Sequence, residues 1–79
     1  MAKHNERLPV FTDRFCELRG SMSNAAFAYA LGISRQTVGF YCNGDRLPDC
    51  VTLRHIAEEC QVSVDWLLGL SNTKAAKGG

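Results

Sequence analysis

Arg35 and Gln36 are the residues of this chain whose types and position say most about chemistry. They follow Ser34, and a helix predicted between Ser34 and Gly44 would place both side chains in its first turn. Arginine and glutamine can hydrogen-bond base edges in the major groove of DNA. The dipole of a helix also favours phosphate near the helix N-terminus. This pair therefore indicates recognition of double-stranded DNA by the beginning of one helix.

The helix predicted between Ser34 and Gly44 has two faces of different character. Ser34 suits the N-cap, because its hydroxyl can accept a free backbone N–H, and Gly44 suits the left-handed position after the helix. Thr37, Val38 and Tyr41 share one side of the helix and can be buried. The other side, which is left for solvent or a ligand, carries Arg35, Gln36, Gly39, Phe40 and Asn43.

The chain offers little for catalysis or metal binding. His4 and His55 are its only histidines, and no pair of its four cysteines has the C-x₂₋₄-C spacing of zinc sites. The sequence contains neither a glycine-rich phosphate loop nor a nucleophile elbow. We therefore expect no enzyme activity, no metal and no cofactor, and we expect His55 to be a surface or half-buried residue.

The composition is typical of one small ordered domain. The chain has 79 residues, 46% of them hydrophobic, and a formal net charge of +1. A core of this size is only marginally stable and would gain from a second subunit. The low charge disfavours massive non-specific binding of nucleic acid but permits a local basic patch. No stretch is long and apolar enough to predict a transmembrane helix.

Both ends of the chain are polar. The first residues lack the apolar segment of a signal peptide, so we expect a cytoplasmic protein whose cysteines are reduced, buried or half-buried structural thiols. We expect residues 1–8 to form a flexible arm, although Lys3, His4 and Arg7 could instead lie along DNA. Residues 71–79 are expected to be a flexible tail or the beginning of a linker, which leaves 9–70 as the folded domain.

Apolar residues at helical spacing predict five helices. These cover 9–19, 24–31, 34–43, a stretch from Asp49 as N-cap to about Cys60, and a short segment within 62–69. Ser23 and Ser63 are the expected N-caps of the second and fifth helices. The residues expected to face the core are Leu8, Phe11, Phe15, Leu18, Phe27, Leu31, Leu53, Ile56, Ala57, Cys60 and Trp66.

The second and third predicted helices are separated only by Gly32, Ile33 and Ser34. Two short helices joined by a tight turn that contains glycine are the sequence signature of a helix-turn-helix. The first of the two is rich in alanine, which favours helix formation and lets another helix approach closely. The sequence therefore predicts a helix-turn-helix whose second helix begins with Arg35 and Gln36.

These features resemble the Cro- and lambda-repressor-like helix-turn-helix family. The resemblance covers about Phe11 to Leu70 and rests on Ala-Phe-Ala-Tyr-Ala-Leu-Gly-Ile-Ser-Arg-Gln-Thr-Val at 26–38, Tyr-Cys-Asn-Gly-Asp-Arg-Leu-Pro at 41–48, Leu-Arg-His-Ile-Ala at 53–57 and Val-Ser-Val-Asp-Trp-Leu-Leu at 62–68. It implies an all-α, compact five-helix bundle and a dimeric regulator of transcription from a bacterium or phage. The run Leu-Arg-Gly-Ser-Met-Ser at 18–23 is similar to prophage repressors.

The resemblance also implies roles for individual positions. Those that match base-reading positions of the family are Arg35, Gln36, Thr37 and Phe40. Those that match contacts to the DNA backbone, including the N-termini of the two helices, are Ser23, Asn24, Ser34, Asn43 and Arg46. Each of them could instead be an ordinary solvated surface residue.

One position departs from the family in a way that affects packing. Cys42 stands where the family often has a glutamate that pairs with an arginine at the position of Arg19. Arg19 has lost that partner in this chain. We therefore expect it to be solvated or to pair with Glu17 or Asp45.

Two functions are compatible with the sequence. The first is a sequence-specific DNA-binding transcriptional regulator, a repressor, that binds a palindromic operator as a homodimer. The alternative is a protein-interaction or antitoxin-like module that uses the same fold. The low net charge, the apolar Phe40 on the exposed face and the loop acids Asp45 and Asp49 motivate the alternative.

Overall fold

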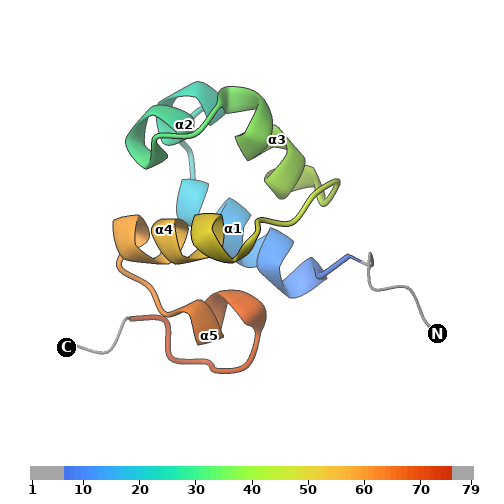
Figure 1. Ribbon diagram of the computed structural model, residues 1–79, viewed down its shortest axis with the longest axis vertical. Helices are drawn as coiled ribbons and strands as arrows, with labels where there is room; N and C mark the ends of the chain where they lie inside the picture. The colour runs from blue at the N-terminus through green and yellow to red at the C-terminus, as the bar shows by residue number, and fades with distance from the viewer. Residues whose placement is uncertain (1–6, 76–79) are drawn as a thin grey trace.

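The computed structural model describes residues 7–75, and this part of the chain contains five α-helices. They are α1 (Pro9–Arg19), α2 (Asn24–Leu31), α3 (Arg35–Asn43), α4 (Cys50–Cys60) and α5 (Val64–Leu68). In Figure 1, α2 and α3 form one end of the molecule, α1 and α4 cross its middle, and α5 lies at the other end. The prediction of an all-α, five-helix fold is confirmed.

Aromatic rings from α1, α2 and α3 form the centre of the core. The Phe15 ring centroid lies 5.5 Å from that of Phe11, 5.2 Å from that of Phe27 and 5.5 Å from that of Tyr41. The Phe15–Tyr41 contact is edge-to-face, an arrangement that aromatic pairs prefer. Helix α1 therefore packs against both helices of the helix-turn-helix.

Side chains near the helix termini explain where the helices begin. Each of Ser23, Ser34, Asp49 and Ser63 accepts a hydrogen bond from the backbone N–H three residues later, which satisfies one free donor of the first turn. The expected N-caps are thus confirmed. The fifth helix is shorter than the predicted segment 62–69, because Ser63 caps it and Gly69 ends it in the left-handed conformation.

The predicted core stripes are confirmed, with graded burial. Phe11, Phe15, Ile56 and Leu67 are buried, and Leu8 and Leu18 are partly buried against them. Leu8 is therefore not part of a loose arm. Residues 1–6, including Lys3 and His4, lie outside the described residues.

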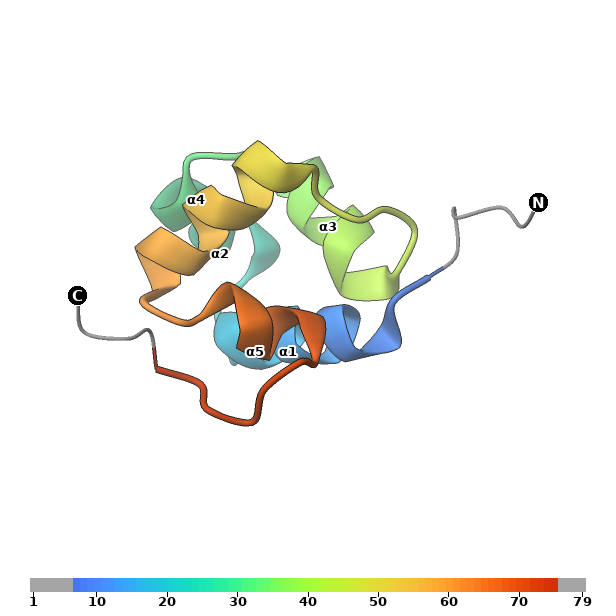
Figure 2. The same cartoon turned by 60° about the horizontal axis from the view of Figure 1, so that its bottom comes forward.

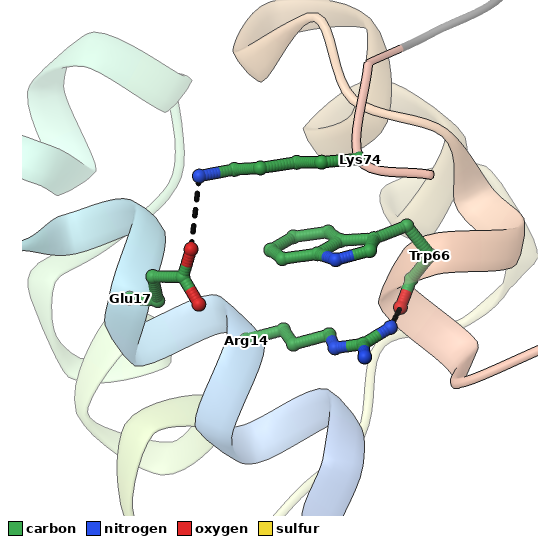
Figure 3. Close-up of polar contacts among 4 residues, drawn as sticks. All are labelled: Arg14, Glu17, Trp66 and Lys74. Carbon is green, nitrogen blue, oxygen red and sulfur yellow. Dashed lines mark hydrogen bonds and ion pairs between the residues drawn. The ribbon is translucent and has the colours of Figure 1, made fainter. Parts of the chain in front are cut away.

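Residues 71–75 pack against the rest of the fold, and the remaining residues of the predicted segment 71–79 lie outside the described part of the chain. Ser63 donates its backbone N–H to the Lys74 carbonyl over 2.9 Å, and its hydroxyl donates to the Thr73 carbonyl over 3.1 Å. Figure 3 shows the Trp66 ring between two cations, with Arg14 4.9 Å and Lys74 5.2 Å from its centroid. This C-terminal segment is thereby joined to α1.

One ion pair and two hydrogen bonds complete that junction. Lys74 pairs with Glu17 over 2.9 Å, so Glu17 is not a partner of Arg19. Arg14 donates to the carbonyls of Trp66 and Ser71. Figure 2 shows the segment passing below α5 and α1.

Replacing Gly69 by alanine is expected to destabilise the fold by about 2–4 kcal/mol. Gly69 has a φ of 82°, and an added Cβ would lie 2.9 Å from Cγ1 of Val10, a stiff β-branched side chain. Urea titration followed by circular dichroism measures the loss.

Gly44 is the matched control, because it has a φ of 84° but its Cβ would meet only Thr12 and Arg7 side-chain atoms at 3.6 and 3.7 Å. Gly44→Ala should cost only about 1 kcal/mol, the penalty of the left-handed conformation. Equal losses in the two variants would show that the contact with Val10 is unimportant.

The four cysteines are free, and they differ in exposure. Cys16, Cys42 and Cys60 are half-buried, as expected, whereas Cys50 is exposed, contrary to the prediction. Cys50 is the first residue of α4, and the residues of that helix that enter the core are Ile56 and Ala57. Burial raises the pKa of the Cys42 thiol to about 11, with a further contribution from its contact with Cys16.

A short treatment with a maleimide at pH 8 should label Cys50 first and Cys42 roughly tenfold or more slowly. The reason is that only the thiolate reacts, and Cys42 with its raised pKa holds very little thiolate at that pH. Peptide mass spectrometry gives the order of labelling. In denaturant, Cys42 and Cys50 should be labelled at similar rates. Faster labelling of Cys42 than of Cys50 in the native protein would contradict the burial of Cys42.

Candidate nucleic-acid interface

The turn between α2 and α3 is fixed by backbone hydrogen bonds. Gly32, with a φ of 74°, donates to the Ala28 carbonyl over 2.8 Å, and Ile33 donates to the same oxygen over 3.1 Å. Nε2 of His55, on α4, lies 2.6 Å from the Leu31 carbonyl and ties the end of α2 to the body of the protein. His55 is half-buried, as expected, and has this structural contact.

The first turn of α3 presents its polar side chains to solvent. Arg35 and Gln36 are both exposed. Ser34 is held in place: its hydroxyl accepts the Thr37 backbone N–H over 3.0 Å and lies 2.7 Å from the Thr37 hydroxyl. Thr37 is half-buried and its hydroxyl is engaged with Ser34. Arg35 and Gln36 are therefore the side chains at this end of α3 that are most available to bind a ligand.

A shallow surface groove gathers most of the residues that the sequence singled out. Its lining comes from the beginning of α2 and from the exposed face of α3. The lining residues are Asn24, Ser34, Arg35, Gln36, Gly39, Phe40 and Asn43. Three predicted site residues, Ser23, Thr37 and Arg46, are outside this lining.

Phe40, which lines the groove, contacts Arg46, which lies outside the lining. The Arg46 guanidinium lies 4.5 Å from the Phe40 ring centroid, in a cation–π contact. Phe40 is half-buried and packs against the core, so it is less exposed than its place on the polar face of α3 suggested. The ring thus serves as a platform for the cation of Arg46.

Asn43 closes the turn after α3. Its side-chain oxygen accepts the Asp45 backbone N–H over 3.0 Å, which leaves the NH₂ group as the part of the amide able to serve a ligand. Asp49 is occupied as the N-cap of α4, and the hydrogen bonds from Thr52 lower the pKa of its carboxyl. The loop therefore combines one cation with two acids.

Arg19 has a partner that the sequence did not indicate. Its Nη1 donates to Oδ1 of Asn24 over 2.6 Å, which replaces the expected solvation or pairing with Glu17 or Asp45. Arg19 and Asn24 flank the loop 20–23. Their closeness in the sequence was the only feature that could have predicted this hydrogen bond. An arginine that loses an acidic partner can take an amide oxygen, because it needs only an acceptor.

The described residues show no cluster of three or more histidine, cysteine or acidic side chains that could hold a metal. The same part of the chain has no helix that is long and apolar enough to span a membrane.

Helix α2, the tight turn and the capped helix α3 form a helix-turn-helix, a motif whose second helix lies in the major groove in many DNA-binding proteins. The Helix-turn-helix family matches residues 17–67, which is more than half of the chain. The chain belongs to the Cro/C1-type helix-turn-helix family. Domains of this family are DNA-binding regulatory domains and are generally not enzymes. Neither the comparison with curated proteins nor that with solved structures gives a match.

Proposed function

We propose that this protein is a sequence-specific transcriptional repressor that inserts α3 into the major groove of double-stranded DNA. The observation that carries the proposal is the placement of Arg35 and Gln36. Both are exposed side by side at the capped N-terminus of α3, in one groove with Asn24 and Asn43. Arginine suits guanine and glutamine suits adenine, because each can make two hydrogen bonds with that base.

The remaining site residues would set the pose of the domain on the duplex. The N-termini of α2 and α3, with Ser23 and Ser34 as caps, offer backbone N–H groups to phosphates. Asn24 at the start of α2, Asn43 at the end of α3 and Arg46 in the loop after α3 would contact the DNA backbone. Thr37 and Phe40 would add contacts at the edge of the base-reading surface.

Two copies of this domain would be needed for useful specificity. One recognition helix covers few base pairs, whereas two domains about 34 Å apart reach successive turns of the same groove. We place the contact between copies at α5 and the residues before it. Leu70, which follows Gly69 at the end of α5, is 75% exposed, and a second copy at this end of the molecule would bury it. The operator would then be palindromic, and the complex would block transcription in the cytoplasm of a bacterium or of a phage-infected cell.

Selection from a random duplex library at near-physiological salt tests the proposal. The purified protein should enrich a palindromic motif, and sedimentation with that duplex should show two chains per duplex. Absence of any enriched motif would overturn sequence-specific binding. A strictly one-to-one complex on a palindrome would overturn the dimer while leaving the reading of sequence intact.

A second candidate is an antitoxin-like module that binds a partner protein as well as DNA. The specific observation is an apolar stretch beside acids: Leu47 is 40% and Val51 79% exposed, and Asp45 and Asp49 are exposed next to them. A pull-down from a native host should then recover one stoichiometric protein partner. Recovery of no stable partner would count against this candidate.

A further inference from the structure

Arg19 determines which end of the Asn24 amide faces the protein. Arg19 ends α1, Asn24 begins α2, and the distance from Nη1 to Oδ1 is 2.6 Å. A guanidinium group has donors but no acceptor, so the amide must turn its oxygen toward it. The Nε atom of Arg19 is buried, which places the guanidinium group partly out of water. The NH₂ group of Asn24 is consequently on the side away from Arg19.

Gly39 shows where that NH₂ group lies. A Cβ added to Gly39 would be 3.7 Å from Nδ2 of Asn24, so the amide nitrogen lies directly over this residue of α3. Asn24 and Gly39 both line the groove that contains Arg35 and Gln36. Because glycine has no side chain, nothing at position 39 projects into the groove in front of the amide. The donor end of Asn24 therefore lies on the side of Gly39 and α3.

We propose that Arg19 is a positioning residue for DNA binding, which holds Asn24 with its NH₂ group toward a phosphate oxygen of the duplex. This inference rests on the proposed function, and it specifies the orientation of the Asn24 amide that a contact with phosphate requires. Without Arg19, the amide is free to rotate by half a turn. Its oxygen then meets the phosphate, and two acceptors repel each other. Arg19 itself does not touch DNA.

A double-mutant cycle on the selected operator tests this assignment. Arg19→Met keeps the length of the side chain and removes its donors. Arg19→Met and Asn24→Ala should each weaken binding by about 5- to 20-fold, the range expected for one hydrogen bond. The double variant should lose no more than Asn24→Ala alone, because Arg19 acts only through Asn24. Multiplied losses would overturn the inference, as would unchanged affinity of Arg19→Met.

The salt dependence separates positioning from direct contact. An arginine that neutralises a phosphate contributes about 0.9 to the slope of log affinity against log salt concentration. Arg19→Met should leave this slope unchanged, whereas a decrease of about 0.9 would show a direct phosphate contact. Arg19→Lys retains a donor and should recover most of the affinity that Arg19→Met loses.

Asn24→Asp distinguishes positioning from a role in folding alone. A carboxylate at the first position of α2 suits both Arg19 and the helix dipole, so the thermal midpoint should rise or stay constant. Its second oxygen would face the phosphate with a negative charge, so operator binding should fall by more than about 20-fold. Tight binding by Asn24→Asp would overturn the inference.

The same experiments show which proposal fails. If the wild-type protein enriches no motif, the proposed function fails and this inference fails with it. If the wild-type protein enriches a motif but the losses of Arg19→Met and Asn24→Ala multiply, only the inference fails. Thermal unfolding of every variant confirms that affinities are compared between folded proteins.

Discussion

The double substitution of Arg35 and Gln36 by alanine is expected to weaken operator binding by about 30- to 10⁴-fold. The range follows from about 1–3 kcal/mol for each pair of hydrogen bonds to a base, and from about 1.4 kcal/mol for each tenfold change in affinity. Both side chains are exposed, so the free energy of unfolding should change by less than about 0.5 kcal/mol. The loss is thus expected in binding alone.

Fluorescence anisotropy with the selected duplex and with a scrambled duplex measures this effect. The variant should approach the affinity of the wild-type protein for the scrambled duplex. Arg54→Ala is the matched control, because Arg54 is exposed on α4 and pairs with Glu58, outside the groove. It removes one positive charge and should change specific binding by only about twofold. If Arg54→Ala weakened binding as much, charge alone would explain the affinity.

Phe15→Ala is expected to destabilise the fold by about 3–5 kcal/mol. The ring is fully buried at 0% exposure and contacts Phe11, Phe27 and Tyr41. Its removal leaves a cavity between α1 and both helices of the helix-turn-helix. The total stability of a domain of this size is of the same order, so a large share of the molecules should be unfolded at room temperature.

Urea titration followed by circular dichroism gives the loss of stability for Phe15→Ala. Tyr29→Ala is the matched control, since it also removes an aromatic ring from a helix but the ring is 91% exposed. The control should differ from the wild-type protein by less than about 0.5 kcal/mol. A similar loss in both variants would mean that the aromatic cluster is not the main source of stability.

Local signals in the sequence were sufficient to predict the helices and the turn. Each of the last four helices is preceded by a serine or aspartate that accepts a hydrogen bond from the N–H three residues later. Both partners of each bond are close in the sequence, so the sequence alone can indicate the bond. The spacing of Phe11 and Phe15 likewise identified the buried face of α1. These elements also indicated which side of α3 would line the groove, because the side of α3 that does not pack against the core stays exposed.

Contacts between distant parts of the chain could not be predicted in this way. The pair of Lys74 and Glu17 joins residues that are 57 positions apart, and nothing in a polar tail indicates where it will lie. Phe40 was assigned to the polar face by its helical position, yet its ring is large enough to reach the core and support Arg46. The bond from Arg19 to Asn24 depends on the angle between two helices, which the spacing of residues does not give.

Helix α1 connects the two ends of the molecule. Phe15 lies against α2 and α3, and on the same helix Arg14 and Glu17 contact α5 and the segment that returns from it. Loss of α1 would therefore expose both the DNA-binding end and the end that contains Trp66. The domain should melt as a single cooperative unit, so that fluorescence of its only tryptophan and ellipticity of all five helices follow one common transition.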